Sequence, residues 1–550
     1  MGLLSLPLRI LGAPPFYTLH WFQRRMIYGR KSIYLSINTE TAPFFSQGTA
    51  WWNSFVGLKK ESDLRTLVIS LSSLPIGWAN IQAFRAELLA LKEKGKSIFM
   101  MIDNSDFRSL YISSVADKVW LSKGKEIFWF GLGGRHNFYG DLLSKLDVQA
   151  DIVAAGEYKS FGEAYTRNSP SEANREQLLS IYSDLQEQYI KEMAESKGIA
   201  PQILLDFMEE SPVSAQRLQE AGLINGECYL DELQEKVKEY TLTKKSWLRF
   251  ESIVLMNWWI HFFHWGDSRP QVGLLFLDGA ITENSRADRG IIAEELAPVF
   301  RYFEMDDNIK AVVLVVNSPG GSATASDKIA RLVKKLKKKK PTAAYFGNVS
   351  ASGGYYFSSL AGDIMASPGT ITGSIGVVGG KIAIGKGLER YGVNGATIAT
   401  GPDTDMLDMW SPFSESQRER FQGFLKRTYD RFLDIVSEGR IMPVEAVQRV
   451  AEGRVWTGRQ AKENGLVDEL GTLEDAVQRI CGRIGVNPQH INRISWRKKV
   501  PFWKRLGGMF SSAQQNSLQG MLFKEAPLLV QQVHERPLEP LMLLPFEVEN

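Results

Sequence analysis

The 550-residue sequence predicts an α/β protein that contains two related domains in tandem. The first observation is an internal repeat: Leu67–Leu71 aligns with Val312–Val316 at a separation of 245 residues. Both segments are short aliphatic runs, typical of buried parallel strands. At the same separation, Tyr111–Ala116 aligns with Tyr356–Ala361. The second observation is that helical stretches follow the predicted strands in both halves, which favours parallel sheets with crossover helices.

The repeat extends along most of the chain. Gly156 aligns with Gly401, so the separation stays constant over about ninety residues. After an adjustment of two residues, Ala221–Asn225 aligns with Asn464–Asp468. We therefore expect two copies of one α/β unit, related by duplication.

Helices are predicted at equivalent places in the two halves. Ile81–Leu91 and Ser326–Leu336 follow the aligned strands. Each half then continues into a long helix, at Ser171–Lys197 and at Ser414–Ser437. The second long helix begins with a serine and a glutamine at capping-box spacing.

Five segments are predicted from this organisation. They are an N-terminal membrane-associating segment (1–30), a first α/β repeat (31–245), an aromatic linker (246–270), a second α/β repeat (271–495) and a C-terminal tail (496–550). Arginine and proline residues interrupt the apolar stretch Gly2–Phe22, which favours a segment that lies on a membrane surface. The aromatic stretch Ile253–Trp265 is too short to span a bilayer and is expected to be buried or in an oligomer contact.

Composition excludes several classes of function. A net charge of only +3 argues against a dedicated nucleic-acid binder. The six histidines have no metal-ligand spacing with nearby acids, so neither a metal site nor another cofactor is predicted. Cys228 and Cys481, far apart in the chain, form neither a disulfide framework nor a metal site.

The two halves differ at a glycine-rich loop. In the second half, Asn317–Ser322 follows a strand and contains two adjacent glycines. Such a loop lets the backbone approach a ligand closely and directs N–H groups at an oxyanion. The first half has Ser72–Gly77 at this place, and its leucine, proline and isoleucine cannot form that loop.

Ser352 is the candidate nucleophile. It precedes Gly353, Gly354 and a predicted helix at Tyr355–Leu360. A tight turn at this place would expose the hydroxyl, with the next N–H directed at the same point. The equivalent residue in the first half, 245 positions earlier, is Phe107.

Lys159 shows the opposite asymmetry. It lies in Ala155–Gly162, whereas the second half has Thr400–Asp405, so that Thr404 takes the place of the lysine. One repeat therefore has a lysine without the serine, and the other has the serine without the lysine. Packing of the two half-sites would assemble one active site.

A serine hydroxyl becomes a nucleophile when a neighbouring base accepts its proton. No histidine lies between His264 and His490, and a triad with His490 would need an unpredicted fold-back. A lysine can replace histidine where burial lowers its pKa from about 10.4 to about 7–8. Lys159 is therefore the preferred base.

Neighbouring residues would support this base. Tyr158 and Phe161 flank Lys159 and are expected to help exclude water from it. Ser374, within Gly369–Gly376, is the candidate for orienting the lysine amine. A purely structural turn residue is the competing interpretation of Ser374.

Four motifs together resemble one protein family. They are Asn317–Gly321, Ala351–Tyr355, Gly369–Gly376 and Tyr158–Ser160. Over about residues 30–485 the sequence is similar to the long form of signal peptide peptidase A, also called protease IV. The resemblance implies the crotonase-like fold shared with the caseinolytic protease. It also implies a serine endopeptidase with a Ser–Lys dyad that hydrolyses hydrophobic peptides, such as cleaved signal peptides, at the membrane.

The resemblance also assigns roles to residues. It implies that Ser352 is the nucleophile, that Lys159 is the general base, and that Gly321 and Gly353 supply the N–H groups of an oxyanion hole. It further implies a bowl-shaped homotetramer at the bacterial inner (plasma) membrane, with the catalytic domains in the periplasm. The N-terminus departs from the pattern, because the long form has a clear transmembrane anchor and Gly2–Phe22 is a poor one.

Two other functions remain open at this point. An acyl-CoA-binding enzyme of the crotonase type would use the glycine-rich loop to hold a thioester enolate and would not need Ser352. A catalytically inactive scaffold would bind membrane peptides without cleaving them. Binding of coenzyme A and labelling of Ser352 distinguish these possibilities.

Overall fold

Two units make up the chain in this computed structural model. It describes residues 33–38, 55, 57–60, 64–72, 74, 77–240, 247–249, 269–283, 290–496 and 541–542. Unit 1 comprises residues 1–132 and 184–269 with residue 550, and unit 2 comprises residues 133–183 and 270–549. Segment 133–183 lies in the first repeat of the sequence but in unit 2 of the structure, so the units do not follow the boundary between repeats.

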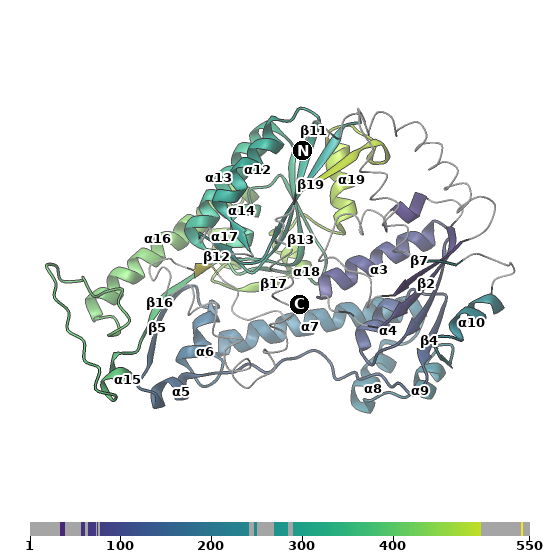
Figure 1. The fold of residues 1–550 in the computed structure, drawn as a ribbon, viewed down its shortest axis with the longest axis horizontal. Coiled ribbons are helices and arrows are strands. Elements are labelled where there is room, and N and C mark those ends of the chain that lie inside the picture. The colour runs from purple at the N-terminus through teal and green to yellow at the C-terminus, as the bar shows by residue number, and fades with distance from the viewer. Residues whose placement is uncertain are drawn as a thin grey trace, which may run out of the picture. The chain divides into compact units, whose positions relative to one another are not determined.

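Unit 1 is built on a parallel sheet (Figure 1). Its described strands lie in the order β6-β4-β3-β2-β1-β7, and each pairing is parallel. The strands are β1 (Ile33–Asn38), β2 (Leu64–Leu71), β3 (Ser97–Ile102), β4 (Lys118–Ser122), β6 (Glu227–Cys228) and β7 (Trp247–Arg249). The helices are η1 (Leu58–Lys60), α3 (Trp78–Glu93), α4 (Phe107–Ser113), α8 (Pro201–Glu210), α9 (Ala215–Glu220) and α10 (Leu233–Glu239).

The predicted elements of the first repeat are present. β2 contains the predicted strand Leu67–Leu71, and every residue of β2 except Arg65 is buried. Such continuous burial is expected of a parallel strand that is covered on both faces. α3 contains the predicted helix Ile81–Leu91. The long predicted helix is α7 (Glu172–Lys197), within which the boundary between the units falls.

Unit 2 contains two sheets. The larger one has the order β17-β15-β13-β11-β8-β19, with β14 paired to β13 and β18 paired to β14. Apart from the antiparallel pair of β15 and β17, its strands are parallel. The smaller sheet has the order β10-β9-β12-β20-β16-β5. In this sheet β5, from the first repeat, runs antiparallel to β16, from the second.

The strands of unit 2 are β5 (Gln149–Ala155), β8 (Gln271–Asp278), β9 (Ile281–Thr282), β10 (Ile291–Ile292), β11 (Ile309–Ser318), β12 (Gly321–Ser322), β13 (Thr342–Ala351), β14 (Asp363–Ala366), β15 (Ile371–Gly373), β16 (Val377–Ala383), β17 (Val455–Thr457), β18 (Glu469–Leu470), β19 (Asn492–Trp496) and β20 (Leu541–Met542). Its helices are α5 (Gly140–Lys145), η2 (Ser160–Gly162), α6 (Glu163–Thr166), α12 (Ala293–Met305), α13 (Ala323–Lys339), α14 (Gly353–Ser358), α15 (Gly385–Glu389), α16 (Glu415–Arg440), α17 (Val444–Val450), α18 (Gly458–Glu463), α19 (Leu473–Arg483) and η3 (Pro488–His490).

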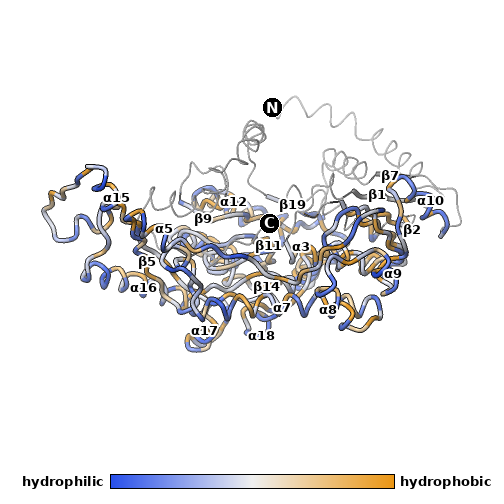
Figure 2. The backbone as a smooth tube through the Cα atoms, turned by 90° about the horizontal axis from the view of Figure 1, so that it is seen from below, coloured by the Kyte–Doolittle hydropathy of each residue, from blue (hydrophilic) through white to orange (hydrophobic). Residues whose placement is uncertain are grey.

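The second repeat also follows the sequence prediction. β11 contains Val312–Val316, and α13 contains Ser326–Leu336. Helix α16 begins with the expected capping box, in which Ser414 and Gln417 bond each other's backbone N–H groups. Hydrophilic and hydrophobic stretches alternate along α16 (Figure 2), as expected of a helix that buries one side. The predicted α/β class, with parallel sheets joined by helices, is confirmed.

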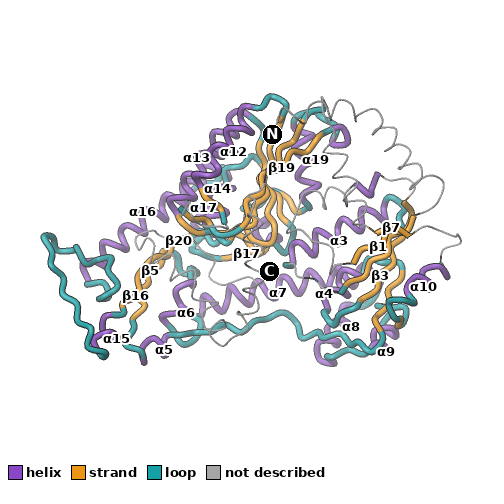
Figure 3. The backbone as a smooth tube through the Cα atoms, viewed as in Figure 1, coloured by secondary structure: helices purple, strands orange, loops and turns teal. Residues whose placement is uncertain are grey.

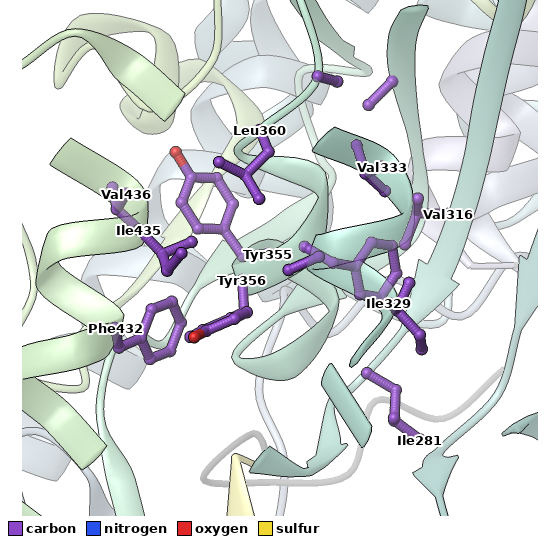
Figure 4. Close-up of a cluster of buried hydrophobic side chains, with 14 of the residues drawn as sticks. Ile281, Val316, Ile329, Val333, Tyr355, Tyr356, Leu360, Phe432, Ile435 and Val436 are labelled. Carbon is purple, nitrogen blue, oxygen red and sulfur yellow. The ribbon is translucent and has the colours of Figure 1, made fainter. Parts of the chain in front are cut away.

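The core of unit 2 anchors the short helix α14 (Figure 4). Tyr355 and Tyr356 of α14 are almost fully buried, at 0% and 1% exposure. The ring of Tyr356 lies 4.9 Å from that of Phe432 on α16, measured between centroids. Burial of two aromatic side chains within one helix of six residues fixes its position firmly. The residue that precedes α14 is therefore held in place as well.

Several predicted segments lie outside the described residues. They are the N-terminal stretch Gly2–Phe22, the aromatic stretch Ile253–Trp265 and nearly all of the C-terminal tail. Among the helices that the structure does describe, none has the length and apolar character needed to cross a membrane.

Candidate active site

Ser352 lies at the junction between β13 and α14, where it is the N-cap residue of the helix. Its backbone has φ 53° and ψ −118°. Residues other than glycine rarely adopt such a conformation, which costs about 1–3 kcal/mol. The backbone N–H of Ser352 donates to the carbonyl oxygen of Gly373 at 2.8 Å. The turn therefore holds the Ser352 side chain, which is 0% exposed, at one place inside unit 2.

Close packing requires the two glycines that follow Ser352. A Cβ atom on Gly353 would lie 2.5 Å from Oγ of Ser326. A Cβ atom on Gly354 would lie 3.0 Å from the carbonyl oxygen of Ser318. The Ser-Gly-Gly motif therefore lets α14 begin directly against the end of β11 and the first turn of α13.

Strand β5 brings Lys159 to Ser352. The chain leaves β5 at Ala155, turns, and places Nζ of Lys159 2.9 Å from Oγ of Ser352. The same nitrogen lies 2.8 Å from Oγ of Ser374 and 3.1 Å from the Ser374 carbonyl oxygen. The three side chains singled out in the sequence therefore meet within unit 2, at hydrogen-bonding distance.

Burial controls the charge of Lys159. The side chain is 3% exposed, and desolvation holds the pKa of its amine well below the usual value for lysine. A neutral amine has two N–H groups and one lone pair. The two N–H groups can donate to the two oxygens of Ser374, and the lone pair can accept from the Ser352 hydroxyl. The three oxygen neighbours of the amine therefore correspond to its two donors and its one acceptor. The arrangement is suited to moving a proton between Ser352 and Lys159.

Two glycines permit the loop that follows β5, which carries Lys159 and is called the lysine loop below, to approach the turn before β17 closely. Gly453 has φ +77°, and a Cβ atom on it would lie 2.6 Å from the backbone nitrogen of Lys159. Gly156 has φ +113°, and a Cβ atom on it would lie 2.5 Å from the carbonyl carbon of Glu452. The backbone N–H of Tyr158 donates to the carbonyl oxygen of Glu452 at 2.8 Å. These contacts between the two main chains thus set the position of Lys159.

Gln177 on α7 also holds this loop, and the sequence analysis did not identify it. Its side chain is 0% exposed, and Nε2 donates to the carbonyl oxygen of Tyr158 at 3.1 Å and to Oγ of Ser160 at 3.2 Å. Oε1 accepts from the backbone N–H of Val455 at 3.2 Å. The available signal was a polar residue four positions before Ile181 and eight before Leu185, and thus on the side of the predicted helix that carries apolar residues, where a buried polar side chain needs partners.

Ser374 combines both interpretations that the sequence left open. It is a turn residue with φ 51°, and its backbone N–H donates to the carbonyl oxygen of Arg454 at 2.7 Å. It also contacts the Lys159 amine through two oxygens. The turn geometry is therefore what directs the Ser374 hydroxyl at Lys159.

The two glycines predicted for an oxyanion hole lie close to each other. Gly321 has φ +150°, and a Cβ atom on it would lie 2.0 Å from the carbonyl oxygen of Ile281, so only glycine fits. A Cβ atom on Gly353 would lie 3.4 Å from the backbone nitrogen of Gly321. The Gly321 main chain therefore passes beside the residue that follows Ser352. Their role in binding an oxyanion stays a prediction.

The residues that flank Lys159 have separate environments. The ring centroid of Tyr158 lies 4.7 Å from Cζ of Arg454, and its hydroxyl donates to Glu176 at 3.1 Å. Phe161 packs against Val378 of β16. Both side chains therefore tie the lysine loop to its neighbours on either side.

In the first repeat, aromatic residues occupy the positions equivalent to Ser352 and Ser374. Phe107 corresponds to Ser352 and begins α4 directly after the turn from β3. Trp129 corresponds to Ser374 at the same separation of 245 residues. The rings of Phe107 and Trp129 stack with centroids 5.7 Å apart. Unit 1 therefore has an apolar aromatic contact where unit 2 has hydroxyl groups.

The fold and the site define a class of protein. A parallel α/β sheet presents a strained serine at a helix N-terminus, and a strand from the other repeat supplies a buried lysine. Among the described residues, no group of three or more His, Cys, Asp or Glu side chains is placed to hold a metal ion. The class is that of tandem-repeat α/β proteins with a serine–lysine pair.

Comparison with known proteins names the family. The model of peptidase family S49 matches two parts of the chain, residues 90–244 and 334–487, which together cover more than half of it. The two matches begin 244 residues apart, close to the separation of the internal repeat. The chain belongs to peptidase family S49, and the resemblance seen in the sequence motifs is confirmed.

Two related proteins are both named as proteases. It is 29% identical over 433 residues to the chloroplastic serine protease SPPA of Arabidopsis thaliana, a match over 77% of this chain and 64% of that protein. It is 30% identical over 421 residues to Protease 4 of Salmonella typhi, over 74% of this chain and 66% of that protein. The match thus spans slightly less than two thirds of these relatives. A solved membrane-bound stomatin-specific protease is 14% identical with a TM-score of 0.29, covering 42% of this chain and 99% of its own.

Proposed function

We propose that this protein is a serine endopeptidase in which Ser352 and Lys159 form the catalytic dyad. One observation carries the proposal: the buried amine of Lys159 lies 2.9 Å from the hydroxyl of Ser352. Desolvation favours the neutral amine, which is the form that can accept a proton. Membership in peptidase family S49 supports this choice of reaction.

The reaction would begin with attack of Ser352 Oγ on a peptide carbonyl carbon. The hydroxyl proton passes to Nζ of Lys159 while the new C–O bond forms. The backbone N–H groups of Gly321 and Gly353 hold the oxyanion. Collapse of the tetrahedral intermediate breaks the C–N bond, and Lys159 returns its proton to the leaving amine. Water, activated by the same amine, then hydrolyses the acyl-enzyme ester.

The substrates would be hydrophobic peptides such as cleaved signal peptides, as the family resemblance implies. We further propose that the protein associates with the bacterial inner membrane, that its active site faces the periplasm, and that it forms a homotetramer. These proposals rest on the family resemblance and on the apolar stretch Gly2–Phe22 of the sequence.

Cleavage of an internally quenched hydrophobic peptide tests the dyad, together with labelling by a fluorophosphonate. Ser352→Ala should abolish both, and Lys159→Met should lower both by about 10²–10⁴-fold. Two matched controls lie nearby. Ser350 is a fully buried serine on β13, two residues before Ser352, and its Oγ makes no hydrogen bond. Lys381 is a lysine with 2% exposure on β16. Ser350→Ala and Lys381→Met should retain cleavage.

The other two functions give different results in the same assay. A crotonase-type enzyme would bind an acyl-CoA in a calorimetric titration and would be insensitive to Ser352→Ala. An inactive scaffold would bind the peptide and show neither cleavage nor labelling. Full peptide cleavage by Ser352→Ala or by Lys159→Met would refute the dyad.

A further inference from the structure

An arginine beside the site contacts two aromatic rings. Arg454 lies in the turn before β17, and its Cζ is 4.7 Å from the ring centroid of Tyr158 and 4.6 Å from that of Trp456. A guanidinium group is attracted to the face of an aromatic ring, and more strongly where water is excluded. The side chain of Arg454 is only 19% exposed. The three side chains are called the Arg454 cluster below.

Stability alone does not explain the place of this arginine. Nη1 of Arg454 lies 2.8 Å from Oε1 of Glu176 on α7, and the other oxygen of that carboxylate accepts from the Tyr158 hydroxyl at 3.1 Å. The Glu176 side chain is 52% exposed, and ion pairs with such access to water contribute little to stability. Nε of Arg454 is buried without a hydrogen-bond partner among the described residues, which costs free energy. A role in the neighbouring site would explain why an arginine stands here.

Two members of the cluster are connected to the lysine and to the serine that contacts its amine. Tyr158 precedes Lys159 in the lysine loop, so the place of its ring constrains the main chain of the base. The carbonyl oxygen of Arg454 accepts from the backbone N–H of Ser374 at 2.7 Å. The hydroxyl of Ser374 in turn lies 2.8 Å from Nζ of Lys159. A displacement of Arg454 would therefore move both the base and the group that orients it.

The third member reaches the nucleophile through one glycine. A Cβ atom on Gly373 would lie 2.8 Å from Cδ1 of Trp456, so the Trp456 ring packs directly on that glycine. The carbonyl oxygen of Gly373 accepts from the backbone N–H of Ser352 at 2.8 Å. Trp456 belongs to β17, which pairs with β15 at Gly373 and lies beside α7 (Figure 3). The Arg454 cluster is thus connected to each of the three polar residues of the site.

We propose that Arg454 is a positioning residue, which holds the lysine loop against β17 and keeps water from the Lys159 amine. The proposal rests on the dyad proposed above, but it concerns a side chain that has no hydrogen bond to Ser352 or Lys159. Desolvation is what keeps the amine of Lys159 uncharged. The contacts of Arg454 with the two rings therefore control the strength of the base as well as its place.

Peptide cleavage by Arg454→Met tests this role. We expect kcat to fall by about 10-fold with little change in KM. The ascending limb of the pH profile of kcat/KM should move to higher pH, because water that reaches the Lys159 amine raises its pKa. Arg217→Met is the matched control: Arg217, in unit 1, lies 5.3 Å from the Phe207 ring centroid and pairs with Glu210 at 2.9 Å. The control should change neither kcat nor the limb, and an unmoved limb in Arg454→Met would overturn the proposal.

Further variants separate the ring contacts from the ion pair. Trp456→Leu should shift the limb in the same direction as Arg454→Met. The double variant should lose little more activity than either single one, because both changes disrupt the same contacts. Glu176→Gln removes the charge of the ion pair, keeps an oxygen acceptor for Tyr158 and should leave the limb in place. Additive losses in the double variant, or an equal shift in Glu176→Gln, would contradict a role of the ring contacts.

Urea unfolding gives a second readout that needs no catalysis. The contribution of Lys159 to the free energy of unfolding begins to rise with pH at the pKa of the amine in the folded protein. This onset should lie at higher pH in Arg454→Met than in the wild type, when each protein is compared with its own Lys159→Met derivative. Equal onsets would refute the positioning role. An inactive wild-type protein in which Arg454→Met still shifts the onset would count against the dyad and not against the role of Arg454.

Discussion

Burial of the Lys159 amine lowers the free energy of unfolding by an amount that depends on pH. In the unfolded chain the amine keeps its proton up to a pH of about 10.4. In the folded protein, desolvation lowers the pKa well below that value. Between these two pKa values the unfolded chain binds one more proton than the folded protein. The free energy of unfolding contributed by this group therefore rises with pH in that window, by about 1.4 kcal/mol per pH unit.

Lys159→Met should remove this contribution. We expect the variant to be more stable than the wild type, with a difference that is largest at low pH and vanishes as the pH approaches about 10.4. Urea unfolding at a series of pH values measures the difference. Lys386→Met, which removes an exposed lysine, is the control and should leave the pH dependence unchanged. An equal pH dependence in Lys159→Met and the wild type would show that Lys159 is charged in the fold.

Gln177 should act on catalysis through the position of Lys159. Gln177→Ala removes one of the two donors to the carbonyl oxygen of Tyr158 and the side-chain acceptor of the Val455 N–H, so we expect a loss of about 1–3 kcal/mol in stability. A displaced lysine should lower kcat by about 10- to 100-fold with little change in KM.

The conservative variant Gln177→Glu separates positioning from simple stability. Its carboxylate still accepts from Val455 and adds a negative charge near the amine, which raises the pKa of Lys159. The ascending limb of the pH profile of kcat/KM should then move to higher pH. A purely structural residue would lower the stability without moving this limb.

At the level of elements, the site depends on turns that bring two main chains into contact. The loop after β5 and the turn before β17 approach so closely that a side chain on either glycine would meet backbone atoms. The β5–β16 ladder sets the direction in which the loop approaches the turn, and Gln177 of α7 hydrogen-bonds to both of them. Local conformational preferences alone would not bring the loop and the turn into contact, because they come from opposite repeats.

Gly453→Ala tests the close approach. Its new Cβ would lie 2.6 Å from the Lys159 nitrogen, so we expect both lower stability and a loss of activity. Gly485→Ala is the matched control, since Gly485 has a similar φ of +66° but no atom within 4 Å of an added Cβ. The control should show only the conformational cost, about 1 kcal/mol, with activity retained. Equal losses of activity would mean that the contact with Lys159 does not matter.

At the level of the whole molecule, unit 2 takes a segment from each repeat. Residues 133–183 carry β5 and Lys159, and residues 270–549 carry β16 and Ser352. The half-site that the sequence assigns to the first repeat therefore belongs, in space, to the same unit as Ser352.

A chain that starts at residue 270 should not be active. It lacks Lys159, and the edge of β16 that pairs with β5 becomes exposed, so we expect no fluorophosphonate labelling and a tendency to associate. Fusion of residues 133–183 to the front of this chain through a flexible linker should restore labelling. Labelling of the shorter chain alone would show that Ser352 is reactive without Lys159.

Much of the fold could be predicted because it depends on local patterns. Aliphatic runs at a fixed separation identified β2 and β11, and a serine and glutamine at the right spacing identified the start of α16. The opposite asymmetry of the repeats at Ser352 and Lys159 pointed to the pair, since each residue lacks a counterpart in the other repeat. Gln177 was not predicted, because nothing in its neighbours along the chain shows what a side chain on a helix will meet.

The linear pattern of residues thus predicted the duplicated α/β architecture, the family and the residues that carry the proposed chemistry. Folding in three dimensions decided which parts of the two repeats share a unit, how deeply Lys159 is buried, and that Phe107 and Trp129 fill the equivalent place in unit 1. The physical reason is that periodicity and turn preferences act between neighbours in the chain. Desolvation and main-chain contacts arise only when residues such as Lys159 and Ser352, 193 positions apart, come together.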